Sequence, residues 1–185
     1  MTSAASVEGR ERVRLFCALT LPGDVLDVLE RWQRDDLRTD ARALRRDQLH
    51  LTLAFLGHRP AEELAPIAGA VEAAAASVQE PLVLSPSRYR ETRSVGMLVL
   101  DDEGGRAGAL AVDLHRRLEA LGVYERESRP WLPHVTVLRF RRPPHLKPPL
   151  PALGPFSPSG AAVYHSVLRP GGAQYDILHS VALGG

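Results

Sequence analysis

The sequence has only one cysteine, Cys17, which excludes a disulfide framework within the chain. That cysteine falls in an apolar stretch, where cysteine usually packs as a small core side chain, so we interpret it as structural. An excess of charge is also lacking, because 23 basic residues stand against 22 acidic ones. This balance argues against a protein that coats nucleic acid through a broad basic field, although it permits a compact phosphate site built from a few arginines.

Long hydrophobic runs are missing as well. No segment of the sequence reaches the length that spans a membrane, and the first dozen residues lack the apolar run of a signal peptide. We therefore expect a cytoplasmic protein without a membrane partner. The 185 residues suffice for one domain with two lobes. We expect residues 1–12 to form a flexible tail, residues 13–185 to form that domain, and the protein to be a monomer.

Apolar patterns and turn residues divide the sequence into strands and helices. Strands are expected at residues 13–21, 49–57, 95–100, 132–140, 161–168 and 175–183, with an edge strand or loop at 81–89. Helices are expected at residues 24–37, 61–78 and 105–121, and Asp24 is expected to cap the first one. This order predicts an α+β fold of two similar lobes, with antiparallel sheets facing a central groove and helices on the outside.

Two of the expected strands carry the same motif, His-x-Thr, at His50-Thr52 and at His134-Thr136. Residues two apart in a strand point to the same side, so each motif places an imidazole and a hydroxyl on one face of an otherwise apolar ribbon. A single motif would be interpreted as a satisfied core or edge pair. Two copies facing one groove suit proton transfer at a phosphate: one imidazole accepts a proton, the other donates one, and the hydroxyls hold phosphate oxygens.

Competing interpretations of the two histidines have less support in the sequence. A zinc site would need a third ligand, and no carboxylate or cysteine stands at a recognisable ligand spacing, so we expect no metal site. A serine or cysteine nucleophile is disfavoured because the chain has no Gly-x-Ser-x-Gly sequence and Cys17 falls in a core strand.

Three segments give the sequence a resemblance to a known family: residues 14–19 (RLFCAL), 50–57 (HLTLAFLG) and 133–137 (PHVTV). They are similar to the 2H phosphoesterase superfamily. Tyr164, Ser166 and residues 170–175 (PGGAQY) resemble the end of one branch, the RNA 2′,3′-cyclic phosphodiesterases, also called 2′-5′ RNA ligases. The resemblance covers nearly all of the chain after Arg12.

The resemblance implies RNA processing: hydrolysis of a terminal 2′,3′-cyclic phosphate to a 2′-phosphate, on RNA ends or on small cyclic nucleotides, without metal or cofactor. By motif, His50 would protonate the departing ribose oxygen and His134 would activate water, although which histidine plays which part stays open. Thr52 and Thr136 would hold the phosphate. A 2′-5′ ligase activity in the same site and a non-catalytic module that binds RNA ends are the alternatives.

Two further positions match the family pattern but conflict with strand alternation. Arg139 matches an arginine that could clamp phosphate oxygens, yet alternation places it opposite His134, so the role requires a twist or a bulge. The alternative is a solvated charge at the strand end. Phe55 matches an aromatic that could stack on the terminal base, but the same alternation turns it toward the core, and we favour core packing.

Several other residues receive no firm role from the sequence. His58 stands where the family often has glutamate, and we interpret it as an exposed loop residue. The basic stretch from Arg88 to Arg93 could line an RNA groove, but a solvated arginine run is the favoured interpretation. The remaining histidines match no motif, and no role is assigned to them: His115, His145, His165 and His179.

Overall fold

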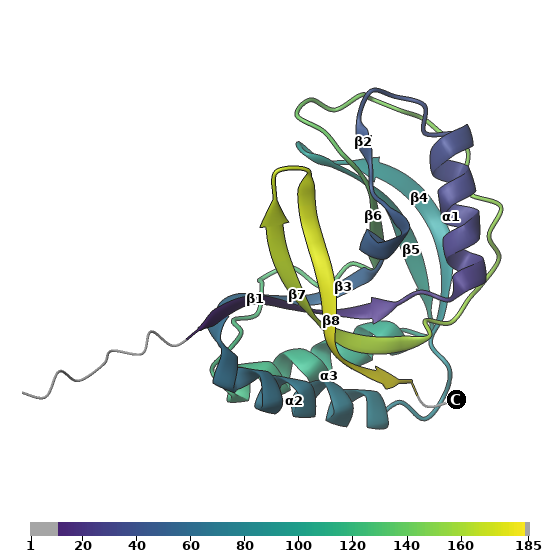
Figure 1. The fold of residues 1–185 in the computed structure, drawn as a ribbon. Coiled ribbons are helices and arrows are strands. Elements are labelled where there is room, and N and C mark those ends of the chain that lie inside the picture. Colours follow the sequence, from purple (N-terminus) through teal and green to yellow (C-terminus); the bar gives the residue numbers. More distant parts are fainter. Residues whose placement is uncertain (1–10, 184–185) are drawn as a thin grey trace, which may run out of the picture.

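A computed structural model describes residues 11–183 of the chain (Figure 1). The first ten residues of the expected tail lie outside these described residues, and Arg12 already belongs to the first strand. No helix among residues 11–183 is both long and apolar enough to cross a membrane.

Sheet A has four antiparallel strands drawn from both ends of the chain. Their order across the sheet is β3 (Leu51–Pro60), β1 (Arg12–Thr20), β7 (Gly160–Arg169) and β8 (Gly172–Ala182). The buried side chains of β1 alternate between two apolar clusters, because Leu15 and Cys17 join the main core while Phe16 and Ala18 join a small cluster on the opposite face. Cys17 is fully buried, as expected, and burial raises the pKa of its thiol to about 12.

Sheet B is also antiparallel, in the order β2 (Arg42–Ala43), β6 (His134–Arg139), β5 (Val95–Glu103) and β4 (Val83–Glu91). The segment with Pro86 is therefore a strand at the edge of its sheet, which is one of the two expected forms. The two-residue strand β2 is not among the expected strands, because two exposed residues carry no periodicity.

Three α-helices cover the sheets: α1 (Gly23–Asp35), α2 (Leu64–Ala76) and α3 (Arg106–Ala120). Two short 3₁₀ turns, η1 (Arg46–Gln48) and η2 (Ala61–Glu63), precede β3 and α2. The expected cap of α1 is wrong: Pro22 occupies the cap position, and Asp24 lies inside the first turn, where its carboxylate accepts the amide of Val25 at 2.9 Å.

Helices α1 and α3 each contact a strand of the sheet other than the one that they follow in the chain. Helix α1 leaves sheet A after β1, yet its Trp32 meets Tyr89 of β4 edge-on, with ring centroids 6.1 Å apart. Helix α3 leaves sheet B after β5, yet it lies against β3 and α2 (Figure 1). One continuous core joins both lobes, and the α+β class and the two antiparallel sheets are confirmed.

Candidate active site

The first motif lies where the chain enters β3. His50 directly precedes the strand, Thr52 is its second residue, and both side chains are half-buried. Nε2 of His50 and Oγ1 of Thr52 are hydrogen-bonded at 3.2 Å, so the two side chains share one face, as strand alternation predicts. Nδ1 of His50 is buried and has no hydrogen-bond partner among the described residues. The backbone of Gln48 nevertheless lies close enough to raise the pKa of the ring.

The second motif opens β6 in the same manner. Nδ1 of His134 donates to the carbonyl oxygen of Leu132, two residues earlier, at 2.8 Å. This hydrogen bond places the ring proton of the neutral imidazole on Nδ1 and leaves Nε2 with a lone pair that can accept a proton. His134 and Thr136 are both half-buried.

The structure brings the two motifs together. Strands β3 and β6 come from different sheets but lie against each other, and Nε1 of Trp131 donates to the carbonyl oxygen of Thr52 at 2.9 Å. The charges of His134 and Arg139 both act on the pKa of His50, which requires all three groups to be close. Two imidazoles, two hydroxyls and a guanidinium therefore gather where the two sheets meet.

A β-bulge follows each motif and changes the direction of the side chain beyond it. In β3, Ala18 pairs with Thr52 while Cys17 pairs with Ala54, so Leu53 is the extra residue. Leu53 and Ala54 are both buried, and the alternation resumes with the following residue on the face of the motif. In β6, Met97 pairs with Thr136 while Gly96 pairs with Leu138, so Val137 is extra in the same way.

The bulge in β3 makes the expected core position of Phe55 wrong. Its side chain is 50% exposed, and it stacks on Phe16 with ring centroids 5.6 Å apart and planes within 10°. The guanidinium of Arg14 lies over the ring, 5.0 Å from its centroid, and donates to Oγ of Ser166 at 3.1 Å. Phe55 therefore presents an aromatic surface beside His50 instead of filling the core.

The bulge in β6 supplies the departure from alternation that a phosphate role for Arg139 requires. Val137 and Leu138 are both buried, whereas Arg139 is exposed at the end of the strand. Among the described residues, no carboxylate forms an ion pair with Arg139, so its charge is available to an anion. In contrast, Arg88, Arg90 and Arg93 are exposed on or just after β4, two strands away from β6.

An aromatic wall surrounds His50, and the sequence analysis missed its extent. The ring of His50 lies 4.9 Å from Phe16, 5.6 Å from Tyr164 and 5.4 Å from Tyr175, measured between centroids. The pKa of His50 is lowered from 6.5 to about 4: burial lowers it most, the Gln48 backbone raises it, and the charges of His134 and Arg139 lower it. The sequence offered one signal for this wall: strand alternation in β1 places Phe16 on the face opposite the core leucines.

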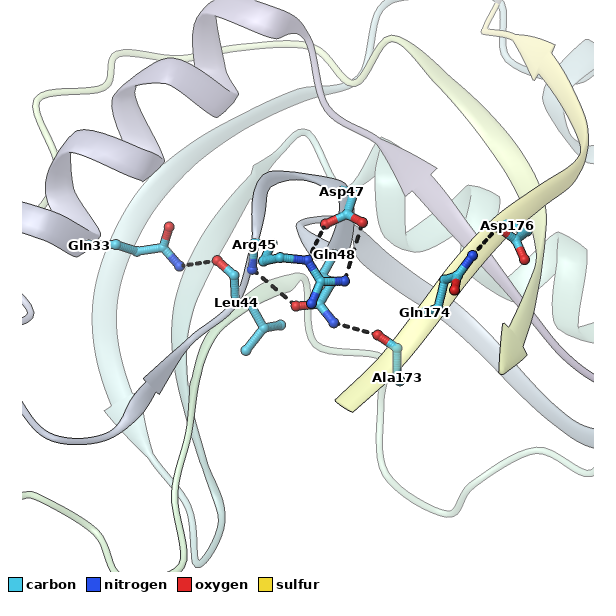
Figure 2. Close-up of polar contacts among 8 residues, drawn as sticks. All are labelled: Gln33, Leu44, Arg45, Asp47, Gln48, Ala173, Gln174 and Asp176. Atoms are coloured by element: carbon cyan, nitrogen blue, oxygen red, sulfur yellow. Dashed lines mark hydrogen bonds and ion pairs between the residues drawn. The ribbon is translucent and has the colours of Figure 1, made fainter. Parts of the chain in front are cut away.

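The segment before His50 is tied to the C-terminal hairpin. Nε2 of Gln48 donates to the carbonyl oxygen of Ala173 at 2.6 Å, and its Oε1 accepts the amide of Arg45 at 3.0 Å. Figure 2 shows Gln48 reaching from η1 to the start of β8. Because Gln48 is buried, these bonds fix the backbone from which His50 projects.

Among residues 11–183, no three side chains of histidine, cysteine, aspartate or glutamate gather as metal ligands. The expectation that the chemistry needs no metal stays a prediction.

Comparisons with known proteins match the chain to one family and to its fold. A family model of the 2′-5′ RNA ligase superfamily matches residues 22–169. An RNA 2′,3′-cyclic phosphodiesterase of Thermus thermophilus is 30% identical over 192 aligned positions, which cover 94% of the chain and 91% of the relative. An Escherichia coli K12 protein of the same name is 29% identical over 145 residues, 70% of the chain and 73% of the relative. The crystal structure of TT0787 from Thermus thermophilus has a TM-score of 0.77 at 30% identity, covering 93% of the chain and 98% of that structure.

The lowered pKa of His50 predicts a pH-dependent loss of stability. The unfolded state binds this proton below about pH 6.5, whereas the folded state binds it only near pH 4, so stability falls as pH drops between these values. Between pH 7 and pH 5 we expect the wild type to lose about 1–2 kcal/mol more than His50→Gln, which keeps a polar side chain but cannot titrate. Urea unfolding at both pH values measures the difference. An equal loss in the two proteins would contradict the buried, neutral histidine.

Proposed function

Because the chain belongs to the 2′-5′ RNA ligase superfamily of 2H phosphoesterases, we propose that it is a hydrolase that opens 2′,3′-cyclic phosphates at RNA ends. The observation that carries the proposal is the meeting of both His-x-Thr motifs with Arg139 in one site. The RNA 2′,3′-cyclic phosphodiesterases of Thermus thermophilus and Escherichia coli supply the substrate class. Small cyclic nucleotides carry the same reacting group and are further candidate substrates.

In the proposed reaction, a water oxygen attacks the phosphorus while the bond from phosphorus to the ribose 3′ oxygen breaks. Nε2 of His134 accepts the proton from water, and His50 donates a proton to the departing 3′ oxygen, which leaves a 2′-phosphate and a 3′-hydroxyl. The hydrogen bond from Nδ1 of His134 to Leu132 supports the acceptor role, because it leaves Nε2 unprotonated in the neutral ring.

The donor role of His50 depends on the substrate. In the free protein His50 has a pKa of about 4 and is neutral at neutral pH. A bound phosphate brings negative charge beside the ring, which opposes the effect of His134 and Arg139 and favours the protonated imidazole. The anionic substrate itself thus prepares the acid that reacts with it, and the two histidines titrate as a coupled pair.

The other groups hold the substrate. Thr52 and Thr136 donate their hydroxyls to phosphate oxygens, and the unpaired guanidinium of Arg139 binds the same oxygens through two parallel N–H groups. The ring of Phe55, which stacks on Phe16 and contacts the guanidinium of Arg14, is half-exposed, and its exposed part offers a stacking surface for the terminal base.

Replacing either histidine tests the paired mechanism. His50→Ala and His134→Ala should each lower kcat by about a thousandfold or more, and the double variant should be little worse than either single one, because each proton transfer needs the other. Product analysis with an oligonucleotide that ends in a 2′,3′-cyclic phosphate measures the rates. Near-normal hydrolysis by either single variant would reject the paired roles, and a joined product instead of a 2′-phosphate would identify a ligase.

Replacing Arg139 tests the phosphate clamp. Arg139→Lys keeps the charge but cannot donate two parallel hydrogen bonds, so we expect kcat/KM to fall by about ten- to a hundredfold. Arg88→Lys is the matched control, because Arg88 is an exposed arginine on β4, and it should retain wild-type kinetics. Equal rates for the wild type and Arg139→Lys would show that Arg139 is a solvated charge.

Chelation tests the assignment of all steps to side chains. Hydrolysis should persist in excess EDTA, and its pH profile should be bell-shaped, because one imidazole must be neutral and the other protonated. Loss of activity in EDTA with recovery on added zinc or magnesium would require His50 and His134 to be reconsidered as ligands.

A further inference from the structure

Two buried polar side chains outside the proposed active site contact the two bulges. Gln33 on α1 is 7% exposed and His115 on α3 is 6% exposed, in cores that are otherwise almost entirely apolar. A buried polar side chain costs free energy unless it is hydrogen-bonded, so the partners of these two residues indicate what they do.

Gln33 binds the bulge of β6. Its Nε2 donates to the carbonyl oxygen of Val137 at 2.9 Å and to that of Leu44 at 3.0 Å. The Val137 carbonyl also accepts the amide of Leu44 at 3.0 Å, so one side chain joins both carbonyls of this pair. Figure 2 shows Gln33 pointing from α1 to Leu44.

His115 binds the bulge of β3 in an equivalent way. Its Nε2 donates to the carbonyl oxygen of Leu53 at 2.7 Å, and its ring packs beside Tyr124 with centroids 4.9 Å apart. Leu53 and Val137 are equivalent positions, since each is the extra residue of its bulge and the third residue after its histidine. Each donor comes from the helix that crossed over from the other sheet.

These contacts stabilise the bulges themselves. An extra residue interrupts the ladder of backbone hydrogen bonds. His115 serves the Leu53 carbonyl, whereas Gln33 serves the Leu44 carbonyl and adds a second donor to the Val137 carbonyl, which already accepts the Leu44 amide. Loss of these buried hydrogen bonds favours a strand register in which the carbonyls regain donors.

Closing either bulge would restore strict alternation and turn Phe55 or Arg139 toward the core. We infer that Gln33 and His115 are positioning residues for the proposed hydrolysis: Gln33 directs Arg139 to the phosphate, and His115 directs Phe55 to the terminal base.

The inference, which rests on the proposed function, makes a prediction about pairs of substitutions. Gln33→Met and His115→Leu keep the side-chain volume but remove the donor, and each should lower kcat/KM about tenfold. Arg139→Lys should add little in the Gln33→Met background and its full effect in the His115→Leu background. Phe55→Leu should show the reverse pattern, because each clamp acts through a different side chain.

Controls separate positioning from general loss of packing. Leu29→Met on α1 and Leu118→Met on α3 alter buried apolar positions whose side chains donate no hydrogen bond to a bulge, and they should retain kcat/KM within about twofold. His115→Gln should recover most of the activity lost in His115→Leu, because its amide can donate to Leu53. Losses that multiply in all four pairs, or a failure of His115→Gln to recover activity, would overturn the inference.

A crystal structure of Gln33→Met tests the bulge without any substrate. The inference expects Leu138 and Arg139 to exchange faces or the pairing of β6 with β5 to change. An unchanged bulge with Arg139 still beside His50 would overturn it. If Gln33→Met does not fold, Gln33→Asn, whose amide is one methylene too short, is examined in the same way. A wild-type protein that fails to hydrolyse cyclic phosphates would reject the proposed function, while this structural comparison would still decide the role of Gln33.

Discussion

The alternation of side chains along β3 and β6 decides which residues lie on the same face where the two sheets meet. In a regular strand the residue five positions beyond a histidine faces the opposite side, so a histidine, the threonine two positions on and a side chain five positions on cannot share a face. One extra residue in each strand removes this conflict. His50, Thr52 and Phe55 consequently form one set, and His134, Thr136 and Arg139 form its counterpart. Each bulge lies three residues after its histidine, so the same backbone irregularity has the same effect in both lobes.

The two sets are alike in geometry but differ in chemistry. The imidazole of His50 lies among aromatic rings that exclude water, whereas that of His134 is oriented by a hydrogen bond to the Leu132 carbonyl. The side chain beyond the bulge is an aromatic ring in one strand and a guanidinium in the other. Under the proposed function, the duplicated scaffold presents a base-binding half and a phosphate-binding half, and one motif performs two different proton transfers.

The sequence predicts the motif faces, the order of the main elements and the class of the fold, because alternation and turn residues are local properties. It also contains a sign of the bulges: Leu53-Ala54 and Val137-Leu138 are adjacent apolar pairs that break the alternation, and strict counting overlooked them. The contacts of α1 and α3 with the opposite sheets could not be predicted in this way. Periodicity identifies the apolar face of each helix but not the sheet against which that face packs. The hydrogen-bond partners of Gln33 and His115 depend on these helix contacts, so the sequence could not predict them either.

Sheet A takes β1 and β3 from the first third of the chain and β7 and β8 from its last part, with β4, β5 and β6 of sheet B between β3 and β7. During synthesis on a ribosome, β1 and β3 emerge long before the strands and the helix α3 that complete their surroundings. The lobe of sheet A cannot be finished until β7 and β8 have been made, so the nascent chain carries an uncovered apolar ribbon until these strands appear. For this topology, translation of the C-terminal hairpin is the event that releases a folded protein, and truncation there would leave the aromatic wall without Tyr164 and Tyr175.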